Sequence, residues 1–153
     1  MQFLGVNISE INKEEALHKV SEFFNSPNQH TIFTPNPEMV VKAQTDEYFK
    51  TVLNSGDLNL CDGMGLQIFT GIKRMPGVDF MLEICRIAAE QGMSVYLLGT
   101  RFDEVAEKTK ENLRIKFPNL KIVGFGKGIE VREVNTRLQV DEAVNNQLIN
   151  NDS

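Results

Sequence analysis

The stretch that decides the fold is residues 58–65, Leu-Asn-Leu-Cys-Asp-Gly-Met-Gly. A short apolar run leads directly into a carboxylate and two glycines, which is typical of a buried strand that turns into the start of a helix. Two further strand-like runs also lead directly into residues that turn the chain. Residues 30–34 run into Thr34-Pro35-Asn36-Pro37, and residues 94–98 run into Gly99-Thr100-Arg101.

Outward from these junctions, short apolar runs alternate with segments of helical periodicity. Strands are expected at 3–8, 30–34, 58–61, 94–98 and 121–125, and helices at 11–26, 37–55, 64–70, 78–90 and 103–117. This alternation predicts one α/β domain over 1–153, Rossmann-like, with a mostly parallel sheet and helices on both faces. Residues 94–98 are expected to form the most fully buried strand, and 127–153 a polar, weakly helical tail.

The bulk composition narrows the class of protein. A net charge of −5 and only one adjacent basic pair, Lys73-Arg74, argue against nucleic acid as a partner, because duplex binding needs a basic face. No apolar run approaches the ~20 residues of a membrane span, and the N-terminus has no signal-peptide pattern. We therefore expect a cytoplasmic protein, with peripheral membrane contact left open. Cys61 and Cys85 are expected to be buried small side chains.

Asp62 is the first candidate for chemistry. A carboxylate at the end of a buried strand faces a ligand on one side and is partly desolvated on the other, as suits a general base. The alternative is that Asp62 only caps the helix that begins at Met64, which spacing alone favours.

Three other residues could line the same sheet edge. Thr34 offers a hydroxyl and Asn36 an amide, although the local alternative is that Asn36 caps the helix beginning at Pro37. Gly99 could let the backbone approach a phosphate. The chain has no Gly-x-Gly-x-x-Gly, no P-loop and no Asp-x-Asp pair, so neither a dinucleotide nor a metal-bound diphosphate is indicated.

Four motifs in order resemble the WecG/TagA/CpsF glycosyltransferases. They are Thr34-Pro35-Asn36-Pro37-Glu38, Asp62-Gly63-Met64-Gly65, Arg74-Met75-Pro76-Gly77-Val78-Asp79 and Leu97-Leu98-Gly99. The opening Leu4-Gly5-Val6-Asn7-Ile8 is also similar. Each motif alone is weak, but their order and spacing over about the first 125 residues make a specific signal.

The resemblance implies an inverting, metal-independent transfer of an N-acetylmannosamine-type sugar. The donor would be a UDP-sugar and the acceptor a polyprenyl-diphosphate-linked N-acetylglucosamine, in teichoic acid or other surface-polysaccharide synthesis. Asp62 falls on the family's catalytic base and Thr34 on its companion. The substrate-binding positions implied are Asn36, Gly63, Arg74, Gly77, Asp79 and Gly99.

The resemblance also implies work at the inner face of the cell membrane, and self-association is possible. The family's later strand, Gly-rich turn and C-terminal membrane appendage have no counterpart here, so we expect a chain shortened at its C-terminus. One consequence would be that this chain has no transferase activity by itself. The alternative function is a non-catalytic nucleotide-binding or interaction module on the same scaffold.

Overall fold

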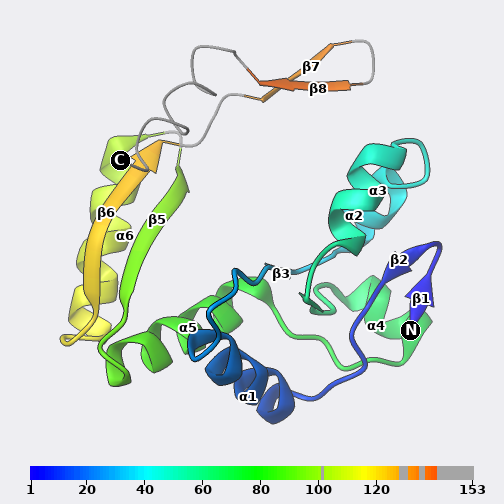
Figure 1. The fold of residues 1–153 in the computed structure, drawn as a ribbon. Helices are drawn as coiled ribbons and strands as arrows, with labels where there is room; N and C mark the ends of the chain where they lie inside the picture. Colours follow the sequence, from blue (N-terminus) through cyan, green and yellow to red (C-terminus); the bar gives the residue numbers. More distant parts are fainter. Residues whose placement is uncertain (101, 128–130, 135–136, 141–153) are drawn as a thin grey trace. The chain divides into compact units, whose positions relative to one another are not determined.

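The computed structural model describes residues 1–100, 102–127, 131–134 and 137–140 (Figure 1). The chain divides into two compact units, Met1–Ile87 and the residues from Ala88 onward, and each is described by itself. The prediction of a single domain remains a prediction.

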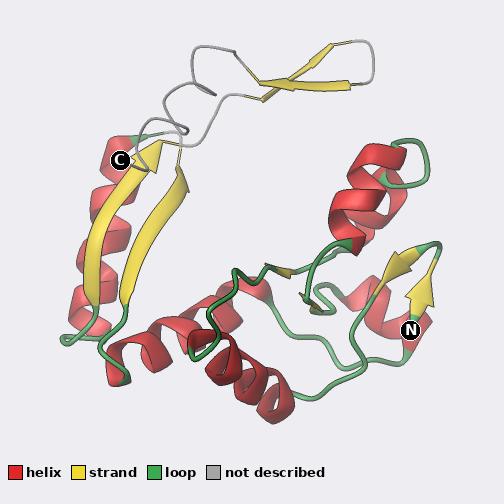
Figure 2. Cartoon of the chain, in the orientation of Figure 1, coloured by secondary structure: helices red, strands yellow, loops and turns green. Residues whose placement is uncertain are grey.

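The first unit contains helices on either side of a short parallel strand pair. Its elements are β1 (Gln2–Phe3), β2 (Val6–Asn7), α1 (Lys13–Phe24), β3 (Ile32–Phe33), α2 (Pro37–Lys42), α3 (Glu47–Asn54), β4 (Leu58–Asn59), α4 (Met64–Thr70) and α5 (Gly77–Glu90), whose end lies in the second unit. β3 and β4 are parallel, with Ile32 opposite Leu58. Figure 2 shows the helices and strands by class. The predicted α/β class is confirmed.

Two apolar clusters cover this strand pair. Leu58 and Leu60 pack with residues of α1 and α5, whereas Cys61 packs with residues of α2, α3 and α4. Cys61 and Cys85 are both buried and free, as predicted. Within the first unit the β3–β4 pair therefore has helices on both faces.

Capping residues set where the helices begin. The Asn12 side chain accepts from the N–H of Glu15, and the Glu15 carboxylate accepts from the N–H of Asn12, which completes the predicted capping box at α1. Asn36 caps α2 in the same way, through the N–H of Met39 at 2.9 Å. The expected single helix over 37–55 is wrong, because Asp46 accepts from the N–H of Phe49 and starts α3 as a separate helix.

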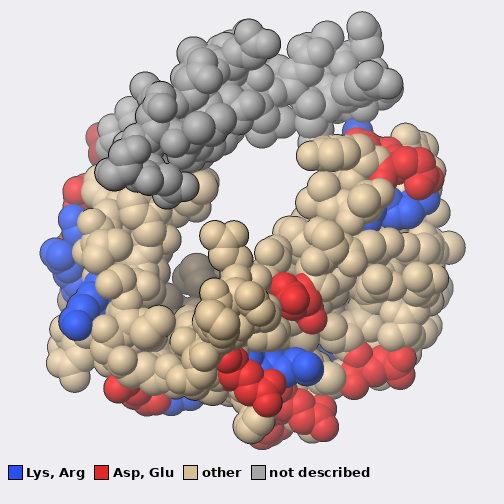
Figure 3. All heavy atoms as spheres, in the orientation of Figure 1, with Lys and Arg blue, Asp and Glu red and all other residues tan. Residues whose placement is uncertain are grey.

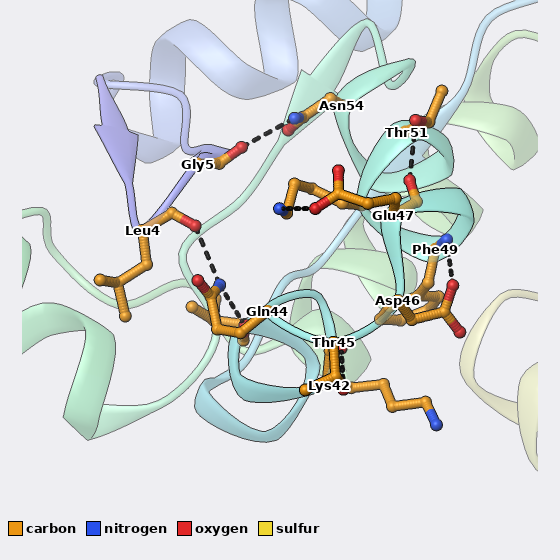
Figure 4. A network of polar contacts seen from close by, with 12 residues as sticks. Leu4, Gly5, Lys42, Gln44, Thr45, Asp46, Glu47, Phe49, Thr51 and Asn54 are labelled. Carbon is orange, nitrogen blue, oxygen red and sulfur yellow. Dashed lines mark hydrogen bonds and ion pairs between the residues drawn. The ribbon is translucent and has the colours of Figure 1, made fainter. Parts of the chain in front are cut away.

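The expected single strand at 3–8 is also wrong. β1 and β2 form an antiparallel hairpin around Leu4 and Gly5, and Leu4 has a φ of +49°. Amide side chains hold this turn: Gln44 donates to the carbonyl of Leu4 at 2.9 Å, and Asn54 donates to that of Gly5 at 2.8 Å (Figure 4). The turn thus adopts a left-handed conformation that the sequence pattern does not indicate, because residues 40 to 50 positions away stabilise it.

The second unit holds a longer parallel pair. β5 (Ser94–Thr100) and β6 (Lys121–Lys127) are parallel and joined by α6 (Asp103–Lys116). Ala106, Leu113 and Ile122 are buried between helix and strands. The prediction that 94–98 is the most buried strand is wrong, because Tyr96 and Leu98 are 58% and 61% exposed.

The predicted helical tail is corrected in part. β7 (Val131–Val134) and β8 (Arg137–Val140) form an antiparallel pair, and the sequence of β8 alternates polar and apolar residues with the period of a strand. The remainder of the predicted tail, 141–153, lies outside the described residues.

Charged side chains of both signs are mixed on the surface. On the face drawn in Figure 3, Lys and Arg lie next to Asp and Glu. Among the described residues, no helix combines the length and apolar character that crossing a bilayer requires.

Candidate active site

The first unit brings two of the three predicted junctions together. Beyond β3 and β4 the backbones remain paired, since the N–H of Leu60 donates to the carbonyl of Phe33 at 2.8 Å and that of Asp62 to Pro35 at 2.9 Å. These bonds place Asp62 beside the segment that carries Thr34 and Asn36. The predicted site edge is therefore present where both strands end.

Asp62 is held by the loop that precedes α5. One carboxylate oxygen, Oδ2, accepts from the N–H of Gly77 at 3.0 Å, and the other, Oδ1, lies 3.4 Å from Nε of Arg74. The side chains of Asp62 and Arg74 are 26% and 42% exposed. The carboxylate is thus fixed in orientation and still open to a ligand.

The alternative reading of Asp62 as a helix cap is wrong. The residue at the cap position of α4 is Gly63, with φ +114°, and the helix has no side-chain cap hydrogen bond. A Cβ on Gly63 would lie 2.8 Å from Cδ of Pro37, so the first residue of α2 packs closely against this turn. Glycine is needed here for both conformation and space, while a direct role of Gly63 in substrate binding remains a prediction.

Gly77 and Thr34 are in close approach. A Cβ built on Gly77 would lie 2.9 Å from the Thr34 hydroxyl and 3.0 Å from its methyl group. The backbone of Gly77 therefore passes directly over Thr34 while its N–H reaches Asp62. Thr34, Asp62, Arg74 and Gly77 form one group of neighbours in the first unit.

The position of Arg74 depends on a residue that sequence reasoning missed. The Gln67 side chain on α4 accepts from the backbone N–H of Arg74 at 2.8 Å, and the N–H of Met75 donates to Cys61 at 2.8 Å. Gly71, in the left-handed region, ends α4 and turns the chain back. The one sequence signal for this contact is Gly71, four residues after Gln67. A glycine at this position indicates that the helix ends and that the chain turns back toward it.

The other three predicted site residues are Asn36, Asp79 and Gly99. Oδ1 of Asn36 caps α2, so the local reading is confirmed and contact with a donor sugar remains a prediction. Asp79 is exposed in the first turn of α5. Gly99 lies in β5 of the second unit with φ +112°, and its place in a site remains a prediction.

Cys61, next to Asp62, is not a candidate nucleophile. Burial raises the pKa of its thiol, a hydrogen bond with Thr70 acts in the opposite direction, and the Asp62 charge raises the pKa further. The thiol therefore stays protonated at neutral pH, and only the thiolate is a good nucleophile. Among the described residues, no group of three or more His, Cys, Asp or Glu side chains could bind a metal ion.

The arrangement is suited to proton abstraction. It offers one oriented, accessible carboxylate, a neighbouring guanidinium and a hydroxyl at the carboxyl ends of two parallel strands, where α/β proteins bind ligands.

The sequence model of the Glycosyl transferase WecG/TagA/CpsF family matches residues 1–148, and the chain belongs to this family. The match extends past the motifs of the first 125 residues. Related curated proteins are the N-acetylglucosaminyldiphosphoundecaprenol N-acetyl-beta-D-mannosaminyltransferases of Staphylococcus aureus strains NCTC 8325 / PS 47 and COL, each 27% identical over 128 residues. The alignments cover 78% of this chain and 50% of each relative, so the chain spans about half the length of these relatives.

Proposed function

We propose that the protein acts as an inverting glycosyltransferase. It would move an N-acetylmannosamine-type sugar from a UDP-sugar to a polyprenyl-diphosphate-linked N-acetylglucosamine in the synthesis of teichoic acid or another surface polymer. The observation that carries the proposal is the Asp62 carboxylate, oriented by Gly77 and Arg74 yet partly exposed. Family membership and the names of the relatives support the substrate class.

In the proposed reaction Asp62 takes the proton of the acceptor hydroxyl, whose oxygen then attacks the anomeric carbon of the donor. The bond to the diphosphate breaks as the new glycosidic bond forms, so the anomeric configuration inverts. General-base catalysis of this kind contributes typically about 10²–10⁴-fold. Arg74, beside Asp62, would stabilise charge on the departing diphosphate, as preorganised cations do in phosphate-releasing enzymes.

Further properties follow from the family resemblance and belong to the same proposal. The transfer would proceed without a metal ion, and the protein would work in the cytoplasm at the inner face of the membrane, where a polyprenyl-linked acceptor resides. Self-association of the chain is a further property that a sedimentation measurement would establish.

The experiment is a transfer assay with UDP-N-acetylmannosamine and a short-chain polyprenyl-diphosphate acceptor. We expect Asp62→Asn to lower kcat by about 10²–10⁴-fold, since an amide cannot take the proton. Asp57→Asn, which neutralises an exposed carboxylate in the same unit, is the matched control and keeps turnover. Equal turnover in Asp62→Asn and wild type would refute the proposal. Binding of UDP-sugar without turnover by the wild-type chain would favour a non-catalytic binding module.

A further inference from the structure

A cavity of about 280 Å³ opens beside Arg74 in the first unit. It lies between the first turn of α1, the loop before α5 and the first turn of α5. Glu14, Lys73 and Asp79 supply charged parts of its wall, and Phe80 supplies an apolar part. We call it the α1–α5 pocket.

Most of the charged side chains in this pocket wall that lack an ion-pair partner among the described residues are negative. Lys13, also in the wall, is bonded to Glu83 at 2.6 Å, and Arg74 lies against Asp62. Glu14, Lys73 and Asp79 are exposed and have no hydrogen-bond or ion-pair partner among the described residues. Two carboxylates against one ammonium group disfavour an anionic diphosphate inside the pocket.

A neutral, hydroxylated ring suits the same wall. Carboxylate oxygens accept hydrogen bonds from hydroxyl groups, and such charge-assisted bonds are stronger than neutral ones. Met75, Pro76 and Phe80 form the apolar part of the wall, and Met75 and Phe80 belong to the buried core behind it. A few polar groups around an apolar surface are the usual composition of a small-molecule site.

We propose that the α1–α5 pocket binds the sugar ring of the acceptor, with Glu14 and Asp79 accepting from its hydroxyls. This inference rests on the proposed function, in which the acceptor hydroxyl must reach Asp62. Arg74 belongs both to the pocket wall and to the contact with Asp62, so this side chain connects the pocket to the proposed base.

The test is an amide chemical-shift titration of the full chain with methyl N-acetyl-β-glucosaminide and, separately, with UDP. We expect the glycoside to shift the amides of Glu14, Lys73 and Asp79, and UDP to leave them unchanged. The double variant Glu14→Gln/Asp79→Asn should raise the Kd of the glycoside about tenfold or more, because two hydrogen bonds to charged groups become weaker bonds to neutral amides. Glu22→Gln, on the same helix but outside the pocket wall, should leave that Kd unchanged.

Two results would overturn the inference. One is a set of UDP shifts at these three amides, which would make the pocket a donor site and leave the glycosyltransferase proposal intact. The other is the absence of glycoside shifts there at millimolar concentrations, or shifts that the double variant does not weaken. Failure of the proposed function shows separately, as undiminished transfer by Asp62→Asn.

Discussion

β3 and β4 are two residues long, whereas β5 and β6 are each seven residues long. The short pair lies in the unit that carries Asp62, and the long pair in the other unit. Around the short pair, side chains bond to backbone: Asn59 donates to the carbonyls of Asn7 and Leu53, at 3.1 and 2.8 Å. The long pair is held by its backbone ladder with α6 packed against it.

The difference shows that the length of a strand ladder does not determine where an oriented side chain is found. In the first unit, amide, hydroxyl and carboxylate side chains replace ladder hydrogen bonds and join segments that are far apart in sequence. Such bonds are individually directional, so the removal of one affects a specific junction. The three predictions below test this contrast, in order of decreasing effect.

Asn59→Leu should give the largest loss of stability. Asn59 is 2% exposed, and leucine of similar size would leave the carbonyls of Asn7 and Leu53 without this donor. At about 1–3 kcal/mol for each of these two unsatisfied groups, the expected cost is about 2–6 kcal/mol. Oδ1 of Asn59 has no partner, so nothing is lost on that side. Native-state hydrogen exchange should show the loss in the first unit.

The matched control lies in the second unit. Thr109→Val removes a bond from an α6 hydroxyl to the carbonyl of Val105, which keeps its place in the helix. We expect a change within about 0.5 kcal/mol, as for most surface substitutions. A cost for Thr109→Val as large as that for Asn59→Leu would contradict the contrast between the units.

Gly77→Ala should have an intermediate effect. The new Cβ would lie about 3 Å from three atoms of Thr34, so either Thr34 or the loop holding Asp62 must shift. Overpacking of this kind costs about 1–3 kcal/mol. In a Thr34→Ala background two of those contacts vanish, so the cost measured by urea unfolding should fall by about 0.5 kcal/mol or more. If the changes in unfolding free energy of the two single variants add up to that of the double variant, the two residues are not in steric conflict.

The smallest effect concerns pH. The N–H of Thr31, and secondarily His30, hold the pKa of Asp57 below its usual value of 3.8. Because the folded pKa is the lower one, this stabilisation is complete above that usual value and is lost as the pH falls through the lowered pKa. Acid titration of unfolding should therefore show a shallower fall below about pH 4 for Asp57→Asn than for wild type.

The sequence predicted the features that depend on local chemistry. The capping box at Asn12, the Asn36 cap and the parallel α/β class follow from side chains within a few residues of one another. The hairpin at Leu4 and Gly5 could not be predicted in this way, because Gln44 and Asn54, which are distant in sequence, stabilise it. The exposed face of β5 was not predicted, because a continuous run of apolar residues does not indicate which face of a strand is buried.

The candidate site shows the same division. Asp62, Thr34 and Arg74 could be named from their strand ends and family motifs, and the structure brings their segments together. The local rule that aspartate before a helix is a cap gave the wrong alternative, since Gly77 and Arg74 bind the carboxylate instead. Gln67 was missed because its bond to Arg74 depends on how the intervening loop returns.

The contacts of Asp62 also bear on the order in which the protein can assemble. Its hydrogen-bond and ion-pair partners among the described residues lie between Pro35, 27 positions before it, and Gly77, 15 positions after it. Loops of this length close at small entropic cost, and local closure favours early formation. During synthesis, all the groups that orient this carboxylate have therefore been joined to the chain before the first residue of the second unit is added.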